Sequence, residues 1–278
     1  QMRYITIFNI IARSITVVLI FSFVHTPNDY LLAALFQSVT LLLAGIFSMF
    51  ILIKNFSYIF VCPNFIGIKK TIVDGWHIFL STIAINIYTT TNTVILGLVT
   101  NNTIVGYFST ANKLIDCVKG VMFTLNQAVY PYVSSMIKRE GNNKAIEFVK
   151  KYLSYYSGAS FFGGALLAIF SPVIIKILFG DGYDESIDIL QLMACLPFII
   201  SISNVFGIQI MLNFGYQKVF SKILVVAALI DFFLVIPLAQ LLQGYGIAIT
   251  MILVESFVTI CTIKCVLRYG LIRLKTVK

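Results

Sequence analysis

Residues 30–53 read YLLAALFQSVTLLLAGIFSMFILI and contain no Asp, Glu, Lys, Arg or His. A helix of this length rises about 36 Å, whereas the hydrocarbon core of a bilayer is about 30 Å thick. The stretch therefore predicts a membrane-spanning α-helix.

The same kind of stretch recurs along the chain. A spanning helix needs about 20 predominantly apolar residues. Eight stretches satisfy this, near 4–24, 30–53, 76–99, 103–135, 152–178, 187–213, 219–242 and 245–267. Turn residues separate them, for example Gln243-Gly244. The pattern predicts an all-α, polytopic transmembrane helical bundle of about eight spans.

The composition agrees with this fold class. Hydrophobic residues make up 59% of the chain and charged residues only 11%, and the mean hydropathy is +0.95. Soluble globular proteins carry roughly 25% charged residues, so lipid must cover most of this surface. The five cysteines lie in or beside apolar runs without a completing set of His or carboxylate ligands. They are typical of buried free thiols, not of a metal site.

The net charge of +9 is unevenly distributed. The turns at 54–75, 136–151 and 214–222 hold three, five and two Lys or Arg residues. The alternate turns, at 25–29, 100–102, 179–186 and 243–244, hold none. This asymmetry follows the positive-inside rule and predicts that both termini are cytoplasmic. Because the cations occupy short turns between apolar runs, a nucleic-acid partner is not expected.

Six charged side chains lie in the interior of the predicted spans, more than three residues from either end. They are Arg13, Lys113, Lys119, Asp116, Asp231 and Glu255. A charge at the centre of a bilayer costs at least about 2.5–3.5 kcal/mol on insertion scales. Such groups usually face an aqueous cavity or a partner, so we interpret them as functional candidates.

The fourth predicted span supports a polar cavity. At 100° per residue its polar side chains fall within an arc of roughly 80°. They are Asn112, Asp116, Lys119, Asn126 and Tyr130. A continuous polar stripe on an apolar helix indicates contact with water or a polar partner.

Structural interpretations stay open beside this one. Lys113, Asp116 and Lys119 are spaced as a self-neutralising ladder that only packs the bundle. Asp231 and Glu255 are candidates for ion pairs with Arg13 or a lysine. A set of small and polar residues recurs at helical spacing in the third predicted span and favours helix packing over ligand contact. They are Asn86, Thr89, Thr90, Thr93 and Gly97. No catalytic constellation is present, and an enzyme is not expected.

Several short motifs resemble one known family. They are VGYFSTANK at 105–113, ILFGDGY at 177–183, LNFGYQK at 212–218 and GYGIA at 244–248. In this order they resemble the O-antigen (Wzx-type) flippase branch of the multidrug, oligosaccharidyl-lipid and polysaccharide exporters. The resemblance covers most of the chain, best from about 71 to 267.

The resemblance implies an architecture of twelve helices in two six-helix lobes. The eight spans would be helices five to twelve, and the first four would be missing, in keeping with a chain that begins with Gln1. Residues 1–70 would hold the last two helices of the N-terminal lobe and the linker. Residues 71–278 would form the six-helix C-terminal lobe.

The resemblance also implies a task in the bacterial inner membrane. The cargo would be an O-antigen repeat on undecaprenyl pyrophosphate, moved from the cytoplasmic to the periplasmic leaflet. Its pyrophosphate would meet the cations Arg13, Lys113 and Lys119, and its sugars the amides Asn86, Asn112 and Asn126. Asp116, Asp231 and Glu255 would couple transport to H⁺ or Na⁺, with no other cofactor. Further expected partners are membrane lipids, an O-antigen polymerase and a chain-length regulator.

Two alternative functions remain open from the sequence. A multidrug exporter of the same superfamily would favour cationic drugs, which disagrees with three cations inside the spans. An integral-membrane O-antigen polymerase usually needs a sizeable periplasmic loop, and the longest outer turn here is 179–186. Both fit less well than a flippase.

Overall fold

The computed structural model describes residues 2–26, 29–56 and 64–271, and the regular structure in these ranges is helical. The chain divides into two compact units, Gln1–Ile68 and Lys69–Lys278. Five of the described helical segments are long and apolar enough to cross a membrane. They are Tyr30–Phe47, Phe79–Val99, Asn142–Phe179, Asp184–Leu212 and Gln217–Arg268. The predicted all-α, multi-pass membrane fold is confirmed.

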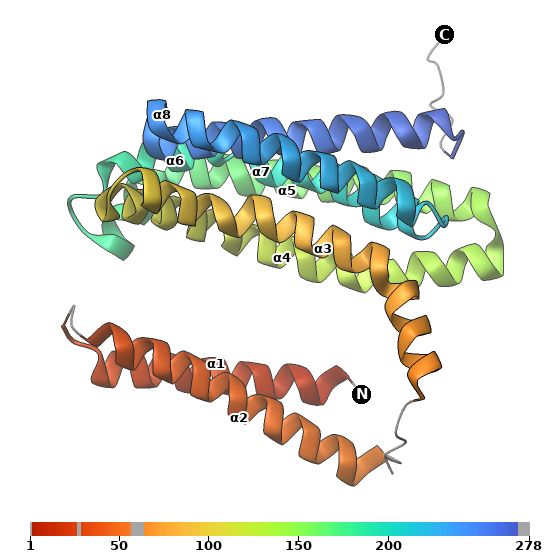
Figure 1. The fold of residues 1–278 in the computed structure, drawn as a ribbon, viewed down its shortest axis with the longest axis horizontal. Helices are drawn as coiled ribbons and strands as arrows, with labels where there is room; N and C mark the ends of the chain where they lie inside the picture. Colours follow the sequence, from red (N-terminus) through yellow and green to blue (C-terminus); the bar gives the residue numbers. More distant parts are fainter. Residues whose placement is uncertain (1, 27–28, 57–63, 272–278) are drawn as a thin grey trace. The chain divides into compact units, whose positions relative to one another are not determined.

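The N-terminal unit contains a helical hairpin, α1 (Met2–Phe23) and α2 (Tyr30–Phe56) (Figure 1). The hydroxyls of Thr16 and Thr40 lie 2.6 Å apart and hydrogen-bond the two helices to each other. In the turn before α2, Thr26 donates to the Asp29 carboxylate through its backbone N–H and its hydroxyl. These hydrogen bonds lower the pKa of Asp29.

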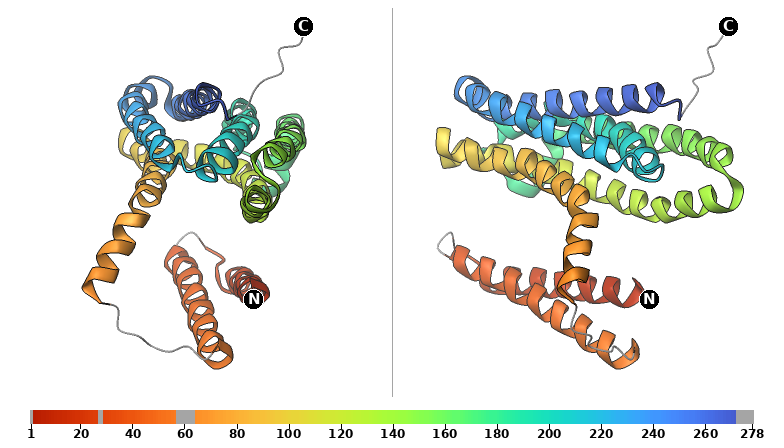
Figure 2. Two further views of the ribbon diagram at one scale, coloured as in Figure 1. Left: turned by 90° about the vertical axis from the view of Figure 1, so that its right-hand side faces the viewer. Right: turned by 45° about the vertical axis from the view of Figure 1, so that its right-hand side comes forward.

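The C-terminal unit is a bundle whose helices run side by side (Figures 1 and 2). Its long helices are α3 (Phe65–Val99), α4 (Asn102–Glu140), α5 (Asn142–Phe179) and α8 (Gln217–Arg268). Asn101 caps α4 by accepting a hydrogen bond from the Ile104 N–H at 3.0 Å. Such a side-chain cap satisfies one of the free N–H groups at a helix start.

The span predicted at 187–213 is broken into three pieces. They are α6 (Asp184–Met193), α7 (Leu196–Asn204) and the π-helical segment η2 (Val205–Leu212). Pro197 in the first turn of α7 cannot donate a backbone hydrogen bond, which favours a break just before it. The two spans predicted at 219–242 and 245–267 both belong to α8. Gln243 interrupts α8 with φ 52° and ψ −128°, at the predicted turn.

The polar connection predicted at 136–151 is largely helical, and this prediction was wrong. Helices α4 and α5 extend through it and are joined at Gly141, whose φ of 88° suits glycine. The ion pair Glu140–Lys144 joins the end of α4 to the first turn of α5, and Glu147–Lys151 lies within α5 at i, i+4 spacing. The mean hydropathy of this stretch shows that its residues are polar but does not show that they are helical.

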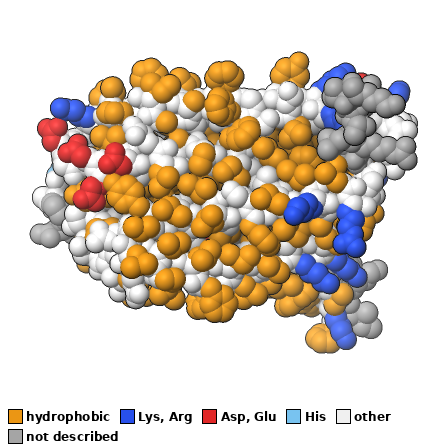
Figure 3. All heavy atoms as spheres, turned by 90° about the horizontal axis from the view of Figure 1, so that it is seen from above, with side chains coloured by type: hydrophobic (Ala, Val, Ile, Leu, Met, Phe, Trp, Pro, Cys, Tyr) orange, Lys and Arg blue, Asp and Glu red, His pale blue; other side chains and the backbone are white. Residues whose placement is uncertain are grey.

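The core of the C-terminal unit consists of two apolar clusters, one toward each end of the bundle. One cluster contains Met122, Val205 and Phe220, and the other contains Phe108, Ile189 and Ile247. The ends of the unit differ in charge. On the face in Figure 3, acidic side chains gather toward one end and most Lys and Arg side chains toward the other.

Candidate functional site

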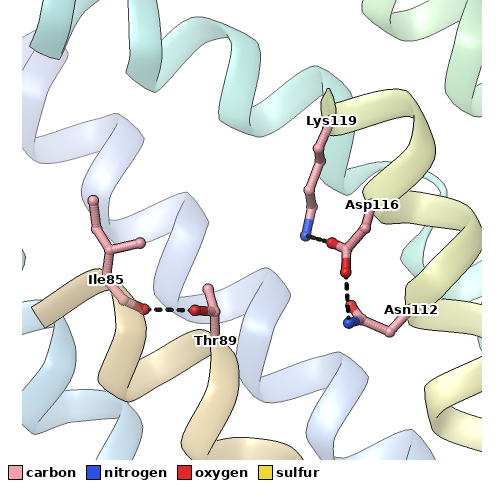
Figure 4. Close-up of polar contacts among 5 residues, drawn as sticks. All are labelled: Ile85, Thr89, Asn112, Asp116 and Lys119. Carbon is pink, nitrogen blue, oxygen red and sulfur yellow. Dashed lines mark hydrogen bonds and ion pairs between the residues drawn. The ribbon is translucent and has the colours of Figure 1, made fainter. Parts of the chain in front are cut away.

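The polar stripe predicted on α4 begins with a hydrogen-bonded cluster of three side chains. Asn112 Nδ2 donates to Asp116 Oδ2 at 3.1 Å, and Lys119 Nζ lies 3.3 Å from Asp116 Oδ1 (Figure 4). The cluster therefore holds one carboxylate between an amide and an ammonium group. We call Asn112, Asp116 and Lys119 the α4 cluster.

The α4 cluster lies on the open side of its helix. Ala111, Leu114 and Ile115 are buried in the bundle, whereas the side chain of Asp116 is 53% exposed. In Figure 4 the three polar side chains extend from α4 toward the side where α3 carries Thr89. Because α4 begins at Asn102, the cluster lies about 15 to 26 Å along the helix, inside the span predicted at 103–135.

The structure confirms only part of the interpretation that Lys113, Asp116 and Lys119 form a self-neutralising ladder. Lys119 pairs with Asp116, but Lys113 is exposed and has no hydrogen-bond or ion-pair partner among the described residues. The α4 cluster with Lys113 thus carries a net positive charge. One buried acceptor is also left over, because Asn112 Oδ1 has no hydrogen-bond partner among the described residues.

Asn126, further along the same stripe, lies in a different environment. Its side chain is 3% exposed, and Gln209 Nε2 donates to its Oδ1 at 2.7 Å and to its backbone oxygen at 3.0 Å. Tyr152 donates to the same Oδ1 at 3.4 Å. Asn126 therefore packs inside the bundle, away from the open side of α4.

The two carboxylates predicted inside the last two spans are both buried on α8. Asp231 is 1% exposed and accepts a hydrogen bond from Asn92 Nδ2 on α3 at 3.0 Å. Its partner is thus a neutral amide, where the sequence left an ion pair open. Glu255 is 7% exposed on the second half of α8, and its backbone oxygen accepts a hydrogen bond from Thr259.

The remaining sequence candidates are exposed. Asn86 lies on α3 and makes no hydrogen bond to the α4 cluster. Arg13 lies in the middle of α1, in the N-terminal unit. Within the described residues no group of three or more His, Cys, Asp or Glu side chains could hold a metal ion.

Comparison with known proteins places the chain among proteins of polysaccharide biosynthesis. A family model described as "Polysaccharide biosynthesis protein" matches residues 1–137. A protein of Escherichia coli K12 named "Putative O-antigen transporter" is 36% identical over 262 residues, which cover 93% of this chain and 62% of that protein. The chain belongs to this polysaccharide biosynthesis family. The resemblance read from the sequence motifs is confirmed.

A second relative in the polysaccharide biosynthesis family comes from Shigella dysenteriae. It carries the same name and is 27% identical over 266 residues, covering 96% of this chain and 66% of that protein. The chain thus spans about two thirds of the length of the curated relatives it matches. The names of both relatives denote a transporter, not an enzyme. No solved structure matches the chain.

Sequence reasoning missed two buried amides. Asn92 binds Asp231, and Gln209 binds Asn126. A usable signal was present, since each is an amide within a predominantly apolar stretch and must find a hydrogen-bond partner there. The sequence does not say which partner, because the pairs lie 139 and 83 residues apart along the chain.

Proposed function

We propose that this protein is an O-antigen flippase. It moves O-antigen repeat units linked to undecaprenyl pyrophosphate from the cytoplasmic to the periplasmic leaflet of the inner membrane. The family membership and the names of its relatives support transport of O-antigen. The lipid-linked form of the cargo, the direction and the membrane are what the family resemblance implies, and the charges of the site and the distribution of cations along the chain support them.

The observation that carries the proposal is the α4 cluster with Lys113. Two lysines and one aspartate lie at membrane depth on the open side of a helix, and Asp116 already neutralises one lysine. A net cation at this depth is costly in lipid unless water or an anion faces it. A pyrophosphate is such an anion, and ammonium groups bind phosphate oxygens through charge-assisted hydrogen bonds.

The neighbouring amide suits the sugar part of the same cargo. Asn112 Oδ1 is a buried acceptor with no partner among the described residues, so a sugar hydroxyl can satisfy it. Asn86 offers a second exposed amide on α3. Arg13, on α1 of the N-terminal unit, is a separate candidate for binding an anionic cargo. Membrane lipids, an O-antigen polymerase and a chain-length regulator are its proposed partners.

The carboxylates supply coupling to an ion gradient in this proposal. Asp231 and Glu255 are buried on α8, and Asp116 is tied to Lys119. Burying a carboxylate costs less free energy once it has bound H⁺ or Na⁺ and is neutral. Ion binding therefore shifts the equilibrium toward the conformation in which the carboxylate is buried. Replacing Asp231 or Glu255 by the neutral amide should abolish ion-driven transport in vesicles. Unchanged ion dependence in both variants would remove them from this role.

The decisive experiment restores surface O-antigen in a strain that lacks its own flippase. The full-length gene is tested with Lys113→Ala, Lys119→Ala and Arg13→Ala individually. A hydrogen bond to a charged group is worth about 1.5–3 kcal/mol, so each change should lower transport roughly tenfold or more. The readout is the amount of surface O-antigen at matched protein levels in the membrane.

A lysine outside the site serves as the matched control. Lys176 lies 3.4 Å from Asp181, and both side chains are largely exposed. Lys176→Ala should leave surface O-antigen unchanged. Full activity of all three site variants would contradict the role of the cations, whereas failure of the wild type would contradict the flippase function itself.

A further inference from the structure

The segment η2 departs from regular α-helix inside the membrane-spanning part of the C-terminal unit. Val205–Leu212 follows α7 without a break and adopts π-helical hydrogen bonding. The segment is followed by a glycine cap, in which Gly215 has φ 83° and the Tyr216 N–H donates to the Met211 oxygen at 2.8 Å. π-Helices are rare and short, and they occur frequently at functional sites. The segment therefore needs a physical cause.

Gln209 provides that cause by connecting η2 to two other helices. The Gln209 side chain is completely buried, and its Nε2 donates to both the side chain and the backbone of Asn126 on α4. Tyr152 of α5 donates to the same Asn126 Oδ1. We call the contact between Gln209 and Asn126 the amide clasp. It fixes the rotation of η2 relative to α4 and α5.

The amide clasp is only half satisfied. Gln209 Oε1 is buried and has no hydrogen-bond partner among the described residues. A buried polar atom without a partner costs about 1–3 kcal/mol, and a leucine would avoid this cost. The amide clasp therefore selects one arrangement of η2 against α4 more than it stabilises the folded protein. Buried polar groups act in the same way when they set the register of a helix pair.

The alternative arrangement is the ordinary α-helix. A π-turn accommodates about one residue more than an α-turn, so conversion rotates the following residues by about 100° about the helix axis. Gln209 and Asn126 would then separate. The rotation would also reach α8, because Gly207 packs directly against the Phe220 ring, which occupies the space where a Cβ would stand.

We propose that Val205–Leu212 is a two-state joint within the C-terminal unit. The amide clasp holds the joint in its π-helical form. Release of the clasp converts it to α-helix and reorients the turn that leads into α8. Asn126 closes this joint and does not contact cargo. The proposal does not depend on the identity of the cargo.

The first test measures local opening by hydrogen exchange of the full chain in lipid nanodiscs. Gln209→Leu removes the donor of the amide clasp while keeping an apolar side chain of similar size. Amides of 205–212 should exchange roughly tenfold faster or more, because each interconversion of the π-helical and α-helical forms breaks their hydrogen bonds, whereas the amides of α4 and α5 stay protected. Asn126→Leu should give the same local pattern. The double variant should add little, because both changes remove one contact.

The control is another glutamine between helices. Gln191 Nε2 donates to Ser171 Oγ at 3.1 Å and connects α6 to α5, outside η2. Gln191→Leu should leave the exchange of 205–212 unchanged. Unchanged exchange in Gln209→Leu would overturn the proposal. Faster exchange spread evenly over the whole unit would also overturn it, since the amide would then only be a packing element.

The second test measures the geometry of the joint. Spin labels are placed at the exposed positions Tyr132 on α4 and Lys218 at the start of α8. The wild type and Gln191→Leu should give one main distance, and Gln209→Leu should add a second population. A single unchanged distance in all three proteins would overturn a two-state joint even if local exchange rises.

Discussion

At the scale of single residues, Asp231 and Asn92 illustrate how the bundle tolerates a carboxylate. Both side chains are buried, and one hydrogen bond of 3.0 Å joins α8 to α3 through them. Neither lipid nor apolar side chains can replace that bond. A neutral donor also allows the carboxylate to gain or lose a proton, whereas a lysine partner would hold it ionised.

Replacing Asn92 alone should cost the protein more stability than replacing Asn92 and Asp231 together. Asn92→Leu removes the donor and leaves a buried carboxylate with one hydrogen bond fewer, so the protein should lose about 1–3 kcal/mol of stability. The double change of Asn92 and Asp231 to Leu should recover part of that loss, because no polar group is then left buried. Thermal unfolding in detergent measures both. A double variant as unstable as the sum of the single changes would contradict the argument.

At the scale of elements, helical periodicity in the sequence predicted which side chains lie together, whereas mean hydropathy predicted only where the helices lie. The 100° rule placed Asn112, Asp116 and Lys119 on one face of α4, and the structure joins them by hydrogen bonds. Those contacts are local, three or four residues apart, so helical geometry alone determines them. The turn at Gln243 was likewise predicted from local residues.

The features that were not predicted depend on contacts between distant segments. The span at 187–213 breaks where α5 approaches it closely, at Gly164 against the Ala194 oxygen. The π-helical form of η2 depends on Asn126, 83 residues before Gln209. A hydropathy window averages over a segment and cannot register either contact.

The approach at Gly164 gives a prediction for this element. A Cβ at Gly164 would lie 2.2 Å from the Ala194 oxygen, a backbone atom that cannot move aside cheaply. Gly164→Ala should therefore destabilise the protein by about 1–3 kcal/mol, the usual cost of overpacking. Gly158 in the same helix has open space around it. Gly158→Ala should be neutral or slightly stabilising, and equal melting temperatures of the two variants would contradict this packing.

At the scale of the whole molecule, the two ends of the C-terminal unit differ in charge. The turn joining α4 to α5 is flanked by five Lys or Arg residues between 136 and 151, whereas 179–186 holds Asp181, Asp184 and Glu185 and no cation. Both helices are close to 40 residues long, which is about 57 Å, so they exceed a bilayer core and carry the cationic end into water. Such an asymmetry sets the orientation of a membrane protein.

The orientation is testable with one cysteine at each end of the unit. Asn143→Cys and Asp181→Cys introduce exposed thiols into a background whose native cysteines are changed to Ser. A maleimide that cannot cross the inner membrane should label position 181 in cells with a permeabilised outer membrane. Position 143 should be labelled only after lysis, because cations are retained on the cytoplasmic side. Labelling of both positions after lysis is the control for reactivity. The reverse pattern in intact cells would place the cationic end outside and reverse the proposed direction of transport.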